Sequence, residues 1–191
     1  MNQLALSDIL PAKLYEPVRD DMRRKVIEIK KHRRVALGDT VTVVFENRAT
    51  MIFQVEEMIR AERIDEPAKI QAELDVYNAL LPEPGQLSAT LFVEITEASS
   101  IRPTLHKLVG IDEHVALHIG DIVVPAAFEP GRSEAERISS VQYIRFTLPP
   151  AAQSALRTPG TSLALVSSQP GYLHRVGLSD DTRKSLAADL D

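Results

Sequence analysis

Helix signals and strand signals are segregated along this sequence, and that segregation constrains the fold more than any other feature. Before Pro82 most apolar residues recur at helical spacing, and Pro84 and Gly85 follow as further stop signals. From Leu87 to Leu178 the chain is mostly β-rich segments separated by turns. Because strands and helices do not alternate as in βαβ units, we expect an α+β protein with an antiparallel sheet or partly closed barrel of about six strands. An N-terminal helical layer and a C-terminal helix complete the prediction.

The stretch before Pro82 contains a strand followed by a pair of helices. Thr40–Glu46 (TVTVVFE) is rich in β-branched residues and predicts a strand. After a turn, Thr50 is placed to cap a helix that begins at Met51 and ends near Ile64. Asp65, Glu66 and Pro67 then signal the start of the second helix. We expect this pair to carry the most unusual polar residues of the chain.

The whole chain, 1–191, is predicted to form a single domain, since its length suits one sizeable hydrophobic core. Within it we expect a helical N-terminal arm over 1–37, with a helix that starts at Pro17. A strand plus the helical pair occupies 38–86, and a β-rich region with short helices occupies 87–191. In that region Gly120-Asp121 predicts a hairpin turn, 129–137 a polar loop, and Ser179 the cap of a final helix.

The absence of cysteine excludes disulfides, thiolate metal sites and a catalytic thiol. The N-terminal residues lack the basic and apolar regions of a secretory signal, and no apolar run approaches the roughly 20 residues of a membrane span. We therefore expect a cytoplasmic protein without membrane association. No catalytic or nucleotide-binding motif is recognisable, which favours a non-enzymatic role, although this remains open.

Helical geometry places two carboxylates of the helical pair beside apolar residues. Glu62 falls within the apolar arc of the first helix, and Glu73 flanks the apolar stripe of the second. A buried carboxylate has to be paired, hydrogen-bonded, protonated or bound to metal. A structural ion pair, with Arg33, Arg34 or Arg63 as partner, is favoured over a metal site or an acid/base pair.

A second hypothesis is a ligand-binding or enzymatic site where the helical pair meets the sheet. In it Arg60 would clamp an anion and the carboxylates would act as ligands or proton carriers. The candidate residues are Gln54, Glu57, Arg60, Glu62, Glu73 and Asn78. No metal or cofactor is predicted: Glu-x-x-His is absent, and His114 and His118 would lie about 13 Å apart on a strand.

The segment from Arg19 to Arg34 is strongly basic, with eight Lys or Arg against three acids, a local charge of +5. The segment from Glu56 to Asp75 has the opposite charge, since it contains seven acids and three Lys or Arg, a local charge of −4. Internal pairing or plain solvation is favoured, ahead of a protein partner. Nucleic acid is disfavoured, because the segment lacks interleaved aromatic residues. The candidate interaction surface comprises Arg23, Arg24, Lys30, Lys31, Arg33 and Arg34.

Five segments carry a family resemblance: FENR, FQVEEMIRAERI, IQAELDVYNALLP, YIRFTL and LAADLD, which together span nearly the whole chain. They resemble a bacterial family filed as domain of unknown function 3501. The resemblance implies no reaction, but it suggests a redox or oxidative-stress setting, with an iron–sulfur or rubrerythrin-like protein as partner. We therefore expect an accessory or protein-interaction module without catalytic activity, and a homodimer stays open. The ligand-binding enzyme and the nucleic-acid binder are the alternatives.

Overall fold

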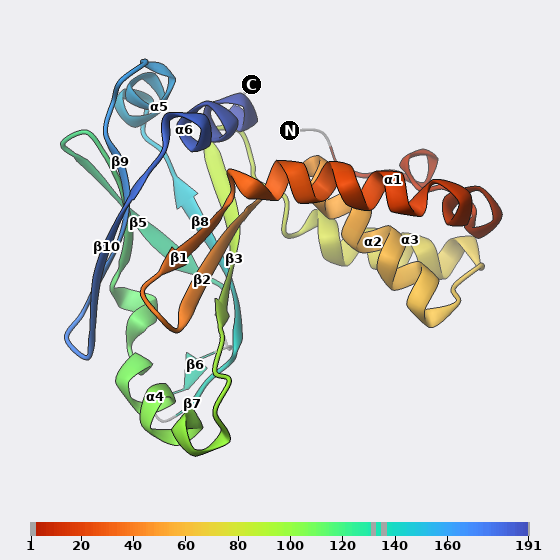
Figure 1. Cartoon of the computed structure of the whole chain (residues 1–191). Coiled ribbons are helices and arrows are strands. Elements are labelled where there is room, and N and C mark those ends of the chain that lie inside the picture. Colours follow the sequence, from red (N-terminus) through yellow and green to blue (C-terminus); the bar gives the residue numbers. More distant parts are fainter. Residues whose placement is uncertain (1–2, 131–132, 135–136, 191) are drawn as a thin grey trace.

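The computed structural model describes residues 3–130, 133–134 and 137–190. Figure 1 shows two parts, a strongly curved sheet and a helical arm that projects from its side. The arm contains α1 (Ala12–Lys31), α2 (Arg48–Glu62) and α3 (Pro67–Asn78), preceded by the short helix η1 (Leu6–Asp8). No helix within the described residues is both long and apolar enough to cross a membrane.

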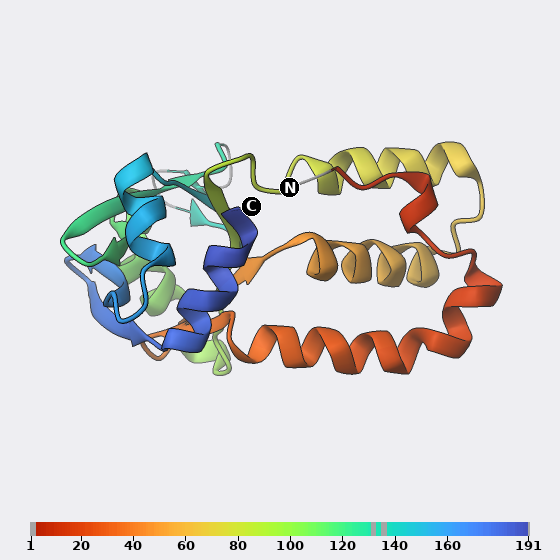
Figure 2. The same cartoon turned by 90° about the horizontal axis from the view of Figure 1, so that it is seen from above.

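Local sequence signals explain where the arm helices begin. Asn47 caps α2 by accepting a hydrogen bond from the Thr50 amide, so the cap lies three residues earlier than the predicted Thr50. Pro67 occupies the first turn of α3, as predicted. Pro17 lies inside α1 and does not start it, so that prediction was wrong. Figure 2 shows that α1 bends near its N-terminal end, and a proline within a helix promotes such a bend.

The arm has its own apolar core, separate from that of the sheet. Its buried members come from the N-terminal segment, α2, α3 and the residues after α3: Leu4, Ile9, Met51, Val55, Ile59, Leu74, Tyr77 and Leu81. The arm is also built from two chain segments, one before β1 and one between β2 and β3. The chain therefore passes between arm and sheet three times, from α1 to β1, from β2 to α2 and from α3 to β3.

The sheet is a nearly closed antiparallel barrel of eight strands. In spatial order these are β1 (Arg34–Leu37), β2 (Val41–Glu46), β3 (Gln86–Val93), β8 (Val141–Thr147), β5 (Ile122–Phe128), β4 (Val115–Ile119), β9 (Leu163–Gln169) and β10 (Tyr172–Leu178). The short pair β6 (Ser133–Glu134) and β7 (Arg137–Ile138) forms a separate ribbon. The prediction of an α+β barrel with N-terminal helices and a C-terminal helix is confirmed.

A tyrosine hydroxyl joins the two ends of the eight-strand sheet. The Tyr172 hydroxyl on β10 donates to the Leu37 carbonyl of β1 at 2.7 Å. It also accepts hydrogen bonds from the amides of Thr40 and Val41, both at 3.0 Å. Gly38, between these residues, has φ = 85° and no room for a Cβ beside the Tyr172 side chain. One hydroxyl thus satisfies three backbone groups at the seam between β1 and β10.

Alternating side chains of the strands fill the barrel, and short helices complete it. The core includes Phe45, Leu91, Leu117, Phe146 and Leu165. The helices are η2 (Ala98–Ser100), α4 (Ile101–Leu108), η3 (Ile111–Glu113), α5 (Pro150–Arg157), α6 (Asp180–Ala187) and η4 (Ala188–Leu190). The predicted Ser179 cap of the final helix is confirmed, since its side chain accepts from the Thr182 amide. The polar loop predicted over 129–137 lies partly outside the described residues.

Arg33 fastens the C-terminal helices to the point where α1 enters β1. Its guanidinium makes a bidentate ion pair with Asp189, at 2.7 and 2.9 Å, and also binds the hydroxyl and the carbonyl of Ser185. Arg33 is only 2% exposed. The prediction that residues 1–37 are helical was wrong at this end, because β1 pairs with β2 from Arg34 onward.

Candidate functional site

A row of polar residues crosses the outer face of β2, β3 and β8. Glu46 on β2 lies opposite Ser88 on β3, which lies opposite Arg145 on β8. Two residues further along β3, Thr90 lies opposite Tyr143. Residues directly opposite in an antiparallel pair share one face, with Cβ atoms about 4.5–5.5 Å apart. The residues that alternate with this row belong to the barrel core, so the row itself faces outward.

A cavity of about 140 Å³, here named the junction cavity, lies over this row. Strands β2, β3 and β8 form its floor. The arm contributes one residue of α2 and one just after α3, and the end of β5 with the two residues beyond it supplies the remaining wall. The lining residues are Glu46, Met51, Leu80, Ser88, Ala89, Thr90, Ala127, Phe128, Glu129, Pro130, Tyr143, Ile144 and Arg145. The cavity is thus lined by both arm and barrel, two parts whose backbones meet at the passages from β2 to α2 and from α3 to β3 (Figures 1 and 2).

Two buried polar atoms beside the junction cavity lack hydrogen-bond partners among the described residues. Glu46 is 5% exposed, and its Oε1 accepts a 3.3 Å hydrogen bond from the Thr90 hydroxyl, but its Oε2 has no partner. The Ser88 Oγ, on a residue 4% exposed, is equally unpartnered. Glu46 directly precedes the N-cap of α2, so the positive end of the helix dipole stabilises its charge in part. An unpartnered buried polar atom still costs about 1–3 kcal/mol.

Arg145 links the junction cavity to the arm. Its guanidinium donates to the carbonyl of Ala79, the residue at the C-terminal end of α3. The carbonyl ends of helices are unsatisfied and carry partial negative charge, so a cation suits this position. The lining of the junction cavity therefore includes two carboxylates, Glu46 and Glu129, and one guanidinium that the arm already engages.

The residues predicted from sequence lie elsewhere on the arm, in three groups. Glu57 and Arg60 face α1. Arg19 forms a bidentate pair with Glu57, at 2.7 Å for both bonds, and the Tyr15 hydroxyl donates to the same carboxylate at 2.6 Å. The Arg19 guanidinium is the main reason that the pKa of Glu57 falls to about 2. Arg60 pairs with Glu16 of α1 at 2.8 Å, so it binds a protein carboxylate and not a free anion here.

Gln54, Glu62 and Glu73 form the second group, around the Tyr77 hydroxyl. Burial raises the pKa of Tyr77, and the charges of Glu73 and Glu62 add to that rise, while a hydrogen bond with Gln54 opposes it. Asn78 stands apart, because its side chain bonds both the amide and the carbonyl of Leu4. Gln54, Glu62 and Glu73 thus lie near enough to Tyr77 to influence its pKa, and ligand binding by them stays a prediction.

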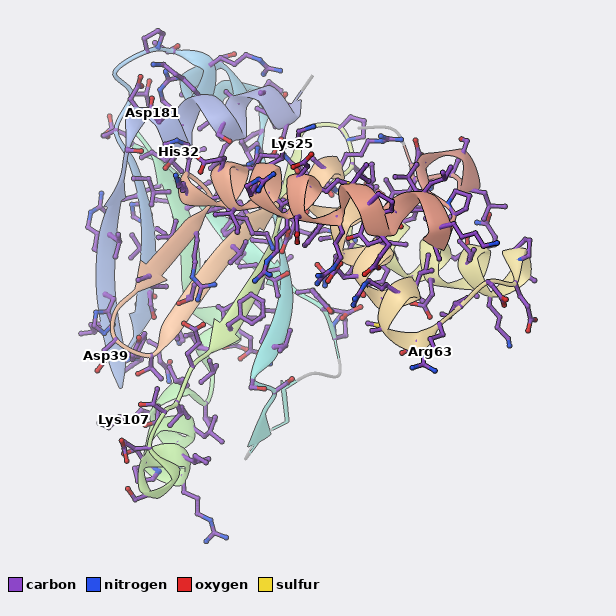
Figure 3. The ribbon with its side chains drawn as sticks, turned by 45° about the vertical axis from the view of Figure 1, so that its right-hand side comes forward. Lys25, His32, Asp39, Arg63, Lys107 and Asp181 are labelled. Atoms are coloured by element: carbon purple, nitrogen blue, oxygen red, sulfur yellow. The ribbon has the colours of Figure 1, made fainter. Side chains whose placement is uncertain are left out.

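Glu62 is exposed, so the expectation that it lies among apolar residues was wrong. Glu56 is the buried carboxylate of α2, with 1% exposure and a 2.6 Å hydrogen bond from the Leu10 amide. Burial raises the pKa of Glu56. The expected partners also differ: Arg34 pairs with Glu94, and Arg63 is exposed and points away from the arm (Figure 3).

Of the predicted basic surface, Arg33 was assigned wrongly, because it is buried against Asp189. Arg23, Arg24, Lys31 and Arg34 are exposed, and Lys30 is half-buried. Three of these make ion pairs, Arg24 with Asp21, Lys31 with Glu28 and Arg34 with Glu94. The favoured reading of internal pairing therefore applies to part of the segment. The contact between α1 and the acidic pair rests on Arg19, Glu57, Glu16 and Arg60.

Sequence reasoning missed the residues of the junction cavity. Ser88 and Thr90 alternate with core residues on β3, a pattern typical of a solvated strand face. The arm and the residues at the end of β5 cover them, and neither contact is visible in the local pattern. The one usable signal was Glu46, an acid that ends an otherwise apolar strand. Within the described residues, no three His, Asp or Glu side chains gather as potential metal ligands.

Comparison with known proteins gives a family and a close structural relative. The family model described as "Protein of unknown function (DUF3501)" matches residues 3–190. The crystal structure of a novel protein of unknown function from Burkholderia pseudomallei is similar, with a TM-score of 0.92 and 34% sequence identity. The similarity covers 100% of both chains. No curated protein matches this chain.

Proposed function

The chain belongs to the DUF3501 family, and from that premise we propose that it binds a small molecule in the junction cavity. One observation carries the proposal: Glu46 and Ser88 line a cavity, and the buried Glu46 Oε2 and Ser88 Oγ lack partners among the described residues. Binding sites commonly combine an apolar lining with a few polar groups that fix the orientation of the ligand. The location agrees with the second hypothesis from the sequence, a site where the helical pair meets the sheet, although other residues form it.

The shape of the junction cavity supports a small ligand. A cavity of about 150 Å³ holds a molecule the size of benzene, and the junction cavity, at about 140 Å³, is similar. Met51 and Leu80 supply apolar contacts from the arm. Ser88 and Thr90 supply hydroxyl groups at the floor. The ligand would therefore have roughly six heavy atoms within the cavity, with a polar group directed at Glu46.

A fragment screen by protein-observed NMR tests this proposal. We expect binders that shift the backbone amide signals of Ser88, Thr90 and Met51. The variant Ser88→Leu fills the cavity and should abolish those shifts, while Thr161→Leu, on a partly exposed residue that does not line the cavity, should leave them unchanged. Binders that retain their affinity for Ser88→Leu would contradict the proposal.

A second candidate is the accessory module for a redox system, and the exposed cations of the projecting arm favour it. Arg23, Arg24 and Lys31 lie on the surface of α1, which extends away from the barrel (Figures 1 and 2). Basic residues outnumber acidic ones on this helix, although Arg24 and Lys31 pair with Asp21 and Glu28, and a net positive charge suits a partner with an acidic surface. The family resemblance suggests that this partner is an iron–sulfur or rubrerythrin-like protein.

Co-purification from native extract tests the second candidate. The wild-type protein should retain an iron–sulfur or rubrerythrin-like companion at low salt, and Arg23→Glu with Arg24→Glu should lose it. The control Arg102→Glu, an exposed residue of α4 outside the arm, should retain it. Recovery of the protein without such a companion would refute this candidate.

A further inference from the structure

We infer that the ligand of the junction cavity carries a primary ammonium group that binds Glu46. This inference rests on the proposed function and specifies the chemical class of the ligand. Its starting point is the Glu46 carboxylate, which is 5% exposed and has no ion-pair partner among the described residues. Buried charges in proteins are normally paired. A cationic ligand would supply the missing partner.

The hydrogen-bond inventory at the floor favours an ammonium group over other polar groups. An ammonium has three donors and no acceptor. At the floor, the Glu46 Oε2 and the Ser88 Oγ have no hydrogen-bond partner among the described residues. The Thr90 Oγ1 donates a hydrogen bond to the other carboxylate oxygen of Glu46. All of these oxygens can accept hydrogen bonds. Opposite positions on neighbouring strands keep Glu46 and Ser88 close enough for one nitrogen to reach both.

The charge of the lining points in the same direction. At the floor itself Glu46 contributes a negative charge, and the one guanidinium of the lining belongs to Arg145. The Arg145 guanidinium donates to the Ala79 carbonyl, and its strand lies on the other side of β3 from Glu46. A carboxylate ligand placed at the floor would instead meet the Glu46 carboxylate directly and be repelled.

The remaining volume fits a short apolar tail. Met51 and Leu80 line the space above the polar floor. Tyr143 adds an aromatic ring, and aromatic rings favour a nearby cation. With about 140 Å³ available, a monoamine with a chain of about five carbons matches both the floor and the walls.

Three probes of similar size test the ammonium assignment: pentylammonium, 1-pentanol and pentanoate. Each is titrated into the full chain by protein-observed NMR, with the amide signals of Ser88 and Thr90 as reporters. We expect pentylammonium to bind at least about tenfold more tightly than either of the others, since hydrogen bonds to charged groups contribute the larger free energies. Glu46→Gln should weaken pentylammonium by about tenfold or more and leave 1-pentanol little changed.

The control is Glu97→Gln, an exposed residue that does not line the junction cavity. It should bind pentylammonium as the wild type does. If 1-pentanol or pentanoate binds as tightly as pentylammonium, or if Glu46→Gln binds it unchanged, the ammonium assignment is overturned while small-molecule binding stands. If none of the probes shifts the reporters and the fragment screen also finds no binder, the proposed function fails together with it.

Discussion

Removing one partner of the buried ion pair between Arg33 and Asp189 should destabilise the protein, whereas replacing both partners by apolar residues should cost much less. Both groups are almost inaccessible, with 2% and 6% of their side chains exposed. Two parallel hydrogen bonds of 2.7 and 2.9 Å join them. Arg33→Met removes the guanidinium and leaves the Asp189 carboxylate buried without its cation. Arg33→Met with Asp189→Leu removes both charges and replaces them with apolar groups.

The expected magnitudes follow from the burial of both partners. Removing one partner of a buried pair costs about 3–5 kcal/mol, because the remaining charge is left uncompensated. For a chain of 191 residues that corresponds to a fall in Tm on the order of 10 °C. Replacing both partners by apolar residues of similar volume is often neutral or stabilising. We therefore expect the double variant to be clearly more stable than Arg33→Met alone.

Urea unfolding followed by circular dichroism, together with calorimetric Tm values, would measure this difference. Arg34→Met is the matched control, because the neighbouring residue makes an exposed pair with Glu94, with 53% and 48% exposure. Such a pair contributes about 1 kcal/mol or less. The reasoning is refuted if Arg33→Met costs no more than Arg34→Met. Additive losses in the double variant would also refute it, since coupling between the two side chains would then be absent.

Two further predictions concern acid stability and the barrel seam. Because Arg19 holds the pKa of Glu57 at about 2, below its ordinary 4.5, this carboxylate contributes stability that is present above pH 4.5 and lost as the pH falls through 2. Glu57→Gln should therefore flatten the dependence of Tm on pH between these values, and an unchanged slope would exclude that role. Tyr172→Phe should lower the free energy of unfolding by about 1–3 kcal/mol. The reason is that the Leu37 carbonyl and the amides of Thr40 and Val41 all lose the hydroxyl to which they are hydrogen-bonded. Hydrogen exchange at the amides of Thr40 and Val41 should accelerate, and unchanged exchange there would contradict this account.

Local patterns predicted most of the secondary structure, because short-range chemistry determines it. The Gly120-Asp121 turn joins β4 and β5, and Ser179 caps α6, both as expected from residue type. The strand β1 was missed because it directly follows a basic helix and contains only four residues. Its β character comes from pairing with β2, and a pairing partner is not a local signal.

The candidate site could not be predicted from the sequence, because the burial of its residues depends on long-range contacts that helical or strand periodicity does not reveal. Helical spacing placed Glu62 on an apolar arc, but α2 ends at that residue and leaves it in solvent. Glu56 is buried instead, because the N-terminal segment crosses α2 and donates the Leu10 amide to it. Arg33 and Arg34 are adjacent residues of the same type. Only the packing of η4 against the start of β1 makes the first a buried cation and leaves the second exposed.

The three passages of the chain between arm and barrel determine how the two parts can move. A rigid body held by one segment can swing about it, whereas one attached through three neighbouring strands has fewer ways to rotate. The three strands β1, β2 and β3 share continuous hydrogen-bonded ladders, which hold the attachment points in place relative to one another. We therefore expect the opposing walls of the junction cavity to keep much of their spacing in the free protein. A ligand would enter a site that is already shaped and would not have to supply the free energy of a closing movement.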